Sequence, residues 1–209
     1  SPVFDDHNQS VSYFEVQTKG KVPEHTTDRT GARCLFCNTF IKKAPLRETA
    51  TKYGTDSIPL AVVVEGKNGR MYLPSTACKV PAIEKPEDPA FDQPMTNDKR
   101  WFSPPLYGLP NFADIFTPRQ LVALITFADL VQEAREQVLV DAVAAGGTLP
   151  DDKRRLEDGG VGATAYADAV ATYLGVGVSR LSDICNSLCM WENTKTQVRH
   201  LFTRQAIPM

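Results

Sequence analysis

Residues 117–145 read TPRQLVALITFADLVQEAREQVLVDAVAA, and this stretch decides the fold class of the C-terminal half. Thr117 predicts the start of a helix, because its hydroxyl can cap the backbone while Gln120 reaches back and Pro118 suits the first helical position. Apolar residues then recur on one face, and Gly146-Gly147 ends the run. We therefore expect one long amphipathic helix, whose apolar face consists of Leu121, Leu124, Ile125, Ala128, Val131, Val138, Leu139 and Ala142.

Two further helices are predicted after the first one. The second runs from about Ala163 to about Leu188, with apolar and small residues at helical spacing. A shorter third helix begins at a cap, either Asn193 or Thr194, and ends before Pro208. The C-terminal part of the chain is therefore predicted to be a three-helix unit.

The N-terminal part has the composition of β-strands. Residues 58–64 (IPLAVVV) and 71–73 (MYL) flank Asn68-Gly69, a pair that favours the positive φ angles of a tight hairpin turn. Seven of the 15 prolines lie between Pro81 and Pro110, and such a segment forms neither a helix nor a central strand. The sequence thus predicts an α+β fold: a β-rich unit over residues 1–80, a proline-rich connector over 81–116 and a helical unit over 117–209.

Composition excludes several classes of protein. The chain is 42% hydrophobic and 23% charged, with a net charge of -2, which is typical of a globular protein and not of a disordered one. It contains no apolar run of about 18 residues and no secretory leader, so we expect a cytoplasmic protein without a membrane partner. Five cysteines are an odd and dilute number, which fits a reducing compartment.

The most specific local motif is the CLFC run from Cys34 to Cys37. Two cysteines at this spacing, in a turn between short strands, form half of a zinc-ribbon site. A redox motif and a pair of purely structural cysteines are the alternatives, and the surrounding Gly, Arg and Asn residues favour a zinc knuckle over a redox motif. A structural zinc site needs four ligands, and the chain has no second CxxC. Zinc is therefore possible at Cys34 and Cys37, but the site is incomplete.

Two groups of basic residues are candidates for contact with nucleic acid. Residues 29–53 contain six basic residues against one acidic residue, and residues 195–204 contain no acidic residue. Local basic clusters suit contact with phosphates, and an ordinary solvated surface is the alternative. The candidate contact residues are Arg33, Lys42, Lys43, Arg47, Lys195, Arg199 and Arg204.

Two other motifs have simpler interpretations than catalysis. Residues 103–107 (SPPLY) are similar to the loop that holds the target amine in amino-methyltransferases, but Leu106 replaces the aromatic residue and no strand precedes the motif. Residues 158–162 (DGGVG) could cradle a phosphate, but they follow no strand. We expect a proline-rich turn in the first case and a flexible entry to a helix in the second.

Four runs together resemble one protein family. They are GARCLFC at 31–37, PLYG at 105–108, FADIFTPRQLVAL at 112–124 and GGVGATAYADAVATYL at 159–174. They resemble the middle of the large prokaryotic adenine-specific DNA methylases that contain a zinc ribbon, and the resemblance extends from about residue 22 to residue 209. Cys34 and Cys37 match the second knuckle of that ribbon.

The resemblance implies that this chain is an internal piece of a larger S-adenosylmethionine-dependent DNA adenine N6-methyltransferase. The cofactor-binding motif and the Asp-Pro-Pro-Tyr catalytic loop of that family lie outside this region, so S-adenosylmethionine is expected only in the parent protein and no catalytic residue is assigned here. The implied module combines a zinc-ribbon-like β-rich unit with a helical unit. Its implied partners are DNA and the remainder of the methyltransferase chain. A non-catalytic scaffolding or protein-interaction module is the alternative.

Overall fold

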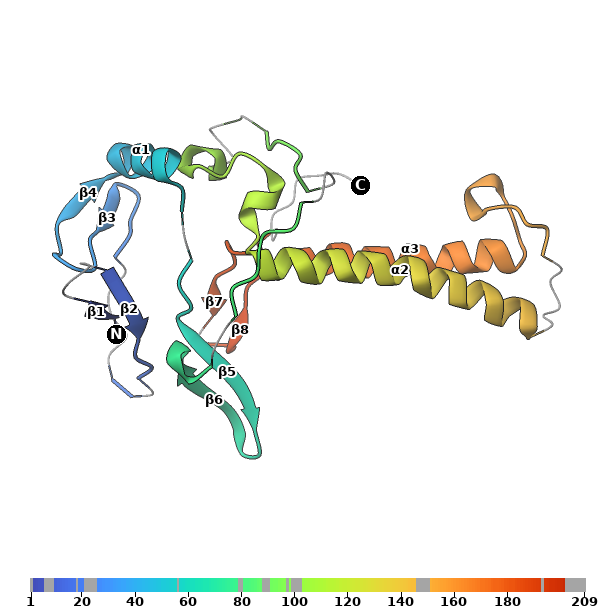
Figure 1. Ribbon diagram of the computed structural model, residues 1–209, viewed down its shortest axis with the longest axis horizontal. Helices are drawn as coiled ribbons and strands as arrows, with labels where there is room; N and C mark the ends of the chain where they lie inside the picture. The colour runs from blue at the N-terminus through green and yellow to red at the C-terminus, as the bar shows by residue number, and fades with distance from the viewer. Residues whose placement is uncertain are drawn as a thin grey trace. The chain divides into compact units, whose positions relative to one another are not determined.

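The computed structural model describes most of the chain, and all structural statements below concern the described part. Its described residues are 2–5, 10–17, 19–20, 26–55, 57–78, 81–87, 91–96, 98, 103–145, 151–192 and 194–201. Within them the fold is mixed α+β, as the sequence predicts (Figure 1). The chain divides into one unit of Ser1–Ala82 with Gln93–Phe112 and a second of Ile83–Asp92 with Ala113–Met209.

The first unit consists of β-hairpins and one helix. Each described sheet in it is an antiparallel pair of neighbouring strands, so its strands are linked by local turns and not by crossovers. Its elements are β1 (Pro2–Asp5) with β2 (Ser10–Phe14), β3 (Gly31–Arg33) with β4 (Phe40–Lys42), helix α1 (Lys43–Tyr53), β5 (Ala61–Gly66) with β6 (Gly69–Pro74), and the 3₁₀ turns η1 (Ser75–Ala77) and η2 (Pro104–Tyr107).

The β5–β6 hairpin confirms the predicted strand pair but not its predicted turn. Gly66 pairs with Gly69, so residues 67–68 form the two-residue loop and only Gly69 has a positive φ, of 110°. This register places Glu65 opposite Arg70, where the two side chains form an ion pair at 2.8 Å. A turn centred on Asn68-Gly69 would shift the register and separate that pair.

The second unit is organised around two long helices that lie side by side (Figure 1). Helix α2 spans Pro118–Ala144 and helix α3 spans Ala163–Ser182. The predicted capping box is confirmed, because the Thr117 hydroxyl accepts a hydrogen bond from the Gln120 backbone and the Gln120 side chain accepts one from the Thr117 backbone. The glycines that predicted the end of α2 lie outside the described residues.

The buried core of the second unit lies at the base of this helix pair. Ile115, from the short 3₁₀ turn η3 (Phe112–Ile115), and Leu121 and Leu124, in the first two turns of α2, are almost fully buried. Ala165 and Ala167 are the buried apolar residues of α3. The glycines of α3 do not serve close helix packing as the sequence suggests, because a Cβ at Gly175 or Gly177 would meet no atom within 4 Å.

The prediction of a third C-terminal helix is wrong for the described residues. Strands β7 (Trp191–Glu192) and β8 (Gln197–Val198) form a short antiparallel hairpin instead. Its sequence contains aromatic and β-branched residues that favour strands, and Thr196 takes the positive φ of the turn, at 48°. Residues 202–208, over which the helix was to continue, lie outside the described part.

The second helix is also shorter than predicted, because α3 ends at Ser182 and not near Leu188. The Asn186 amide donates hydrogen bonds to the carbonyls of Ser182 and Asp183, and its oxygen accepts one from the Leu188 backbone. A side chain that binds the backbone in this way competes with helical hydrogen bonds. Cys185 and Cys189 consequently lie in a turn and not on a helix face.

Candidate functional site

The predicted cysteine pair lies on the β3–β4 hairpin, whose entry is fixed by one carboxylate. The Asp28 side chain accepts hydrogen bonds from the Thr30 backbone at 2.6 Å and from the Gly31 backbone at 3.0 Å. The Thr30 hydroxyl, followed by these two backbone groups, lowers the pKa of Asp28. Gly31 is required here, because a Cβ would lie 2.1 Å from the Ile41 carbonyl oxygen. The two strands therefore approach more closely than any other residue would allow.

The turn between β3 and β4 holds Cys34 and Cys37 on one tight loop. The Cys34 backbone donates to the Thr39 carbonyl, and the Asn38 backbone donates to the Cys34 carbonyl, both at 2.9 Å. Asn38 takes a positive φ of 59°, a conformation that Asn tolerates better than most residues. The loop thus has the turned backbone that a two-cysteine knuckle needs.

The hydrogen bonds of Cys37 favour its thiolate form. Its sulfur lies 3.2 Å from the Thr39 hydroxyl oxygen. Hydrogen bonding with the Thr39 side chain, then with the Thr39 backbone and with Cys34, lowers the pKa of Cys37. Zinc binds the thiolate and not the thiol, so this environment prepares Cys37 to act as a ligand.

Two thiols do not fill a zinc site, and the described residues supply no further ligand. Among them there is no group of three or more His, Cys, Asp or Glu side chains that could hold a metal ion. Cys78 is exposed at the end of η1, and burial raises the pKa of Cys185 and of Cys189 in the other unit. His7 and His25 lie outside the described residues. Within the described residues, Cys34 and Cys37 are therefore two possible ligands without a third beside them.

Basic and aromatic side chains share one face of the β3–β4 hairpin. Arg33 lies opposite Phe40, and Lys42 is two residues further along the same strand as Phe40, so the three side chains share a face. All three are exposed, and the Arg33 guanidinium lies 5.9 Å from the centre of the Phe40 ring. Lys43 follows at the first position of α1 and is half-buried. We call Arg33, Phe40, Lys42 and Lys43 the knuckle face.

Arg47 is predicted to contact nucleic acid, but its side chain makes contacts within the protein. Its guanidinium lies 5.4 Å from the centre of the Tyr107 ring, and its Nε is buried without a hydrogen-bond partner. Tyr107 belongs to η2, which packs on α1: a Cβ at Gly108 would lie 2.6 Å from the Ala50 carbonyl oxygen. The SPPLY motif therefore forms a turn that supports α1, in keeping with the simpler interpretation of that motif.

The second basic cluster belongs to the other unit. Lys195 is exposed in the turn between β7 and β8, and Arg199 follows β8 with its guanidinium 3.9 Å from the Glu192 carboxylate. Arg204 lies outside the described residues. The structure thus places Arg33 beside the cysteine loop and Lys42 and Lys43 at the other end of the same hairpin. It places Lys195 and Arg199 on a separate hairpin.

The glycine-rich loop before α3 lies next to a carboxylate of the protein itself, that of Asp151. The Asp151 carboxylate accepts hydrogen bonds from the Thr164 backbone and hydroxyl, both at 3.1 Å, in the first turn of α3. These bonds, the backbone bond first, lower the pKa of Asp151. A Cβ at Gly162 would lie 2.5 Å from the Asp151 Cα. The loop is therefore closely packed, and the Asp151 carboxylate already supplies a negative charge at the N-terminus of α3.

Sequence reasoning missed two buried carboxylates in the second unit. Asp168 on α3 binds Arg135 on α2 through an ion pair at 2.6 Å and accepts a hydrogen bond from the Leu156 backbone at 3.0 Å. Asp183, at the end of α3, lies 2.9 Å from His200 and 3.0 Å from Arg180. The pairs of Asp168 with Arg135 and Asp183 with His200 join distant positions and have no spacing signal in the sequence.

Comparisons with known proteins leave the family of the chain undetermined. No protein-family model, curated protein or solved structure matches it. None of the helices in the described part of the chain combines the length and the hydrophobicity needed to cross a membrane.

Proposed function

We propose that this chain is a non-catalytic zinc-ribbon and helical module of an S-adenosylmethionine-dependent DNA adenine N6-methyltransferase, in which it contacts or positions DNA. The observation that carries the proposal is the knuckle face. Cationic side chains and an aromatic ring share a face of the hairpin that carries Cys34 and Cys37. The parent's remaining segments would supply cofactor binding and methyl transfer.

The chemistry of the knuckle face suits a phosphate backbone. Arg33 and Lys42 are exposed, and neither has an acidic residue opposite it in the hairpin. Exposed cations gain affinity for DNA by releasing condensed counterions, and an exposed aromatic ring such as Phe40 can stack on an unpaired base. Phosphate contacts fix the position of a protein on DNA without reading its sequence. This is the role of a positioning module.

The resemblance of residues 22–209 to the methylase family supports the same proposal. The hydrogen-bonded thiol of Cys37 supports the zinc-ribbon part of it, since that environment favours the thiolate that zinc requires. Within the chain Cys34 and Cys37 would hold the metal, which would brace the loop that joins the two strands of the knuckle face.

Salt-dependent DNA binding tests the proposal. Fluorescence anisotropy with a short labelled duplex should show binding that weakens steeply between about 50 and 200 mM salt. Each phosphate contact contributes about 0.9 to the slope of log K against log salt, so R33A/K42A should lower that slope by roughly 2. Lys67→Ala, an exposed lysine in the β5–β6 turn, is the matched control and should leave the slope unchanged. Absence of binding at low salt, or equal slopes for all variants, would contradict DNA contact by this surface.

A non-catalytic protein-interaction module is the second candidate, and a different observation favours it. Helix α3 carries no charged residue between Ala163 and Ser179 except Asp168, which is buried and paired. A helix without exposed charge is usually covered by another apolar surface. If the chain does not bind DNA but this helix is covered in the complete protein, scaffolding is the better description.

A further inference from the structure

The exposed side of α3 carries no charged residue until Arg180, in its last turn. Tyr166 is 60% exposed and Tyr173 is 81% exposed. Val176, nearer the C-terminal end of the helix, is also exposed. These residues recur at the spacing of a helix seam, together with Val170 and Gly177. In contrast, the exposed side of α2 carries the carboxylates Asp129, Glu133, Glu136 and Asp141. We call Tyr166, Val170, Tyr173 and Gly177 the α3 seam.

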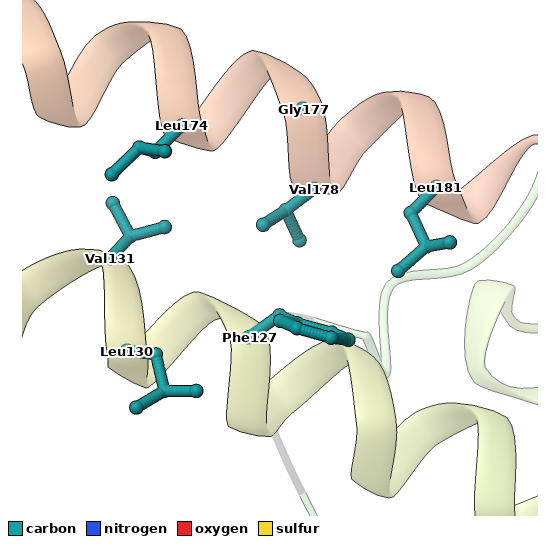
Figure 2. Close-up of a pocket in the computed structure, with 7 residues that line it drawn as sticks. All are labelled: Phe127, Leu130, Val131, Leu174, Gly177, Val178 and Leu181. Atoms are coloured by element: carbon teal, nitrogen blue, oxygen red, sulfur yellow. The ribbon is translucent and has the colours of Figure 1, made fainter.

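An apolar groove continues the α3 seam toward α2. The groove has a volume of about 400 Å³ and is lined by Phe127, Leu130 and Val131 of α2 and by Leu174, Gly177 and Val178 of α3, among others. Figure 2 shows Leu174 and Val131 pointing toward one another across it. Gly177 belongs to both the groove and the seam, so the two form one continuous apolar surface.

Gly177 is not required by the packing of this chain. A Cβ at this position would meet no atom within 4 Å, and Gly177 does not have a positive φ. Glycine within a helix nevertheless costs about 1 kcal/mol relative to alanine. The missing side chain of Gly177 leaves a notch on the helix surface. The chain does not fill this notch, so it has room for a side chain of another molecule.

The pattern of large and small residues along the seam is self-complementary. When a second α3 packs antiparallel about a two-fold axis near residues 171 and 172, Tyr166 of one copy lies opposite Gly177 of the other. Val170 then lies opposite Tyr173. In a two-fold contact each such pair occurs twice, so two tyrosines enter two glycine notches. The seam matches a copy of itself as a ridge matches a groove.

We infer that the α3 seam and the adjoining groove form a homodimer interface, in which two α2–α3 hairpins pack antiparallel through α3. Charge favours this occupant, because the seam has no like charges to bring together and the carboxylates of α2 remain on the outside. It also disfavours DNA, because the seam itself contains no cation and Arg180, three residues beyond Gly177, is paired with Asp183. The inference is independent of the proposed DNA contact.

The exposed apolar area is sufficient for such a contact. With roughly 150–250 Å² for each aromatic side chain, and less for each aliphatic one, the exposed parts of Tyr166, Tyr173, Leu174, Val176, Phe127 and Leu130 amount to on the order of 700 Å². A standard interface buries about 800 Å² on each partner. We therefore expect reversible association with a dissociation constant in the micromolar range.

Sedimentation equilibrium of the 209-residue chain tests the inference. The chain should approach twice its monomer mass of 23.0 kDa at high micromolar concentration. Tyr173→Arg should weaken association at least tenfold, because it buries a charge at the seam. Thr172→Arg is the matched control: the neighbouring Thr172 is exposed but lies off the seam, so the dimer should persist. Circular dichroism of both variants checks that the helices remain folded.

A charge exchange tests the antiparallel register. Tyr166→Glu and Gly177→Lys should each weaken the dimer, whereas the double variant Y166E/G177K should recover much of it, because opposite charges then meet across the axis. The two positions are roughly 16 Å apart along one helix, so they cannot pair within a chain. A monomeric unmodified chain, a dimer insensitive to Tyr173→Arg, or a double variant weaker than both single ones would overturn the inference.

Discussion

Helices α1 and α3 differ in the side chains that they leave exposed. Helix α1 has no buried residue, and its Arg47 and Lys52 lie over the rings of Tyr107 and Tyr53. Helix α3 has buried residues and, apart from the paired Asp168, no charge before Arg180. The difference indicates that α1 is held by a few specific contacts with its neighbours, whereas α3 is held by apolar packing. Substitutions should therefore affect the two regions in different ways.

The largest effect is expected in the core below α3. Leu124→Ala removes a side chain that is only 1% exposed and leaves a cavity between α2 and its neighbours. It should lower the free energy of unfolding by about 2–5 kcal/mol, measured by urea denaturation followed by circular dichroism. Val140→Ala, at an exposed position near the end of α2, should change it by less than about 0.5 kcal/mol. Similar values for both variants would show that α2 and α3 are not held by this core.

The second-largest effect on stability should differ in sign between a glycine of β3 and a glycine of α3. Gly31→Ala forces a Cβ against the Ile41 carbonyl, so β3 and β4 must move apart, at a cost of about 1–3 kcal/mol. Gly175→Ala meets nothing within 4 Å in helix α3 and should stabilise it by about 0.5–1 kcal/mol. Amide hydrogen exchange at β3–β4 and at α3 measures each effect locally. Unchanged exchange in β3–β4 of the first variant would contradict the close strand approach.

A smaller effect should appear on acidification. The Leu156 backbone hydrogen bond, followed by the Arg135 side chain, lowers the pKa of Asp168. Since the folded-state pKa lies below the unfolded value, the stabilisation is present above about pH 4 and is lost as the pH falls through the folded value. Asp168→Asn should lower the melting temperature of the helices by roughly 3 °C at neutral pH. This difference should shrink as the pH falls through the folded-state pKa of Asp168, because both proteins then lack the charge.

The exposed Asp129 of α2 provides the control for that experiment. Asp129→Asn removes a carboxylate from the same pair of helices without breaking a described ion pair. Its melting temperature should follow that of the unmodified chain at both pH values. A deficit in Asp168→Asn that stays constant with pH would mean that the ion pair is not its cause.

Local signals in the sequence predicted the elements that local interactions determine. The capping box of Thr117 and Gln120 and the β5–β6 hairpin are examples, since each depends on residues a few positions apart. Helix α1 escaped prediction because its half-buried side consists of Lys43, Leu46, Arg47 and Ala50, of which only two are apolar. The third helix was wrong because a strand pair at Trp191 and Val198 competes with a helix over the same short segment.

In the candidate site, too, the sequence predicts local structure but not the contacts between separate segments. The spacing of Cys34 and Cys37 predicts a tight loop, and the charges nearby predict a basic surface. The spacing does not predict that Arg33, Phe40 and Lys42 share one face, because this depends on the register of β3 against β4. Nor does it predict that Arg47 lies over Tyr107, which is brought to α1 from a distant segment.

The smallest effect on the helices is expected from metal removal, and it tests whether the two regions are independent. Cys34 and Cys37 are two ligands where a closed zinc site needs four, so the purified chain should contain substoichiometric zinc. A chelator should remove that zinc without changing the melting of α2 and α3, because their core involves neither cysteine. Metal analysis and thermal unfolding of the unmodified chain and of Cys34→Ser measure both quantities. One tightly bound zinc per chain, lost together with the helices in Cys34→Ser, would show that further ligands complete the knuckle and that the two regions are coupled.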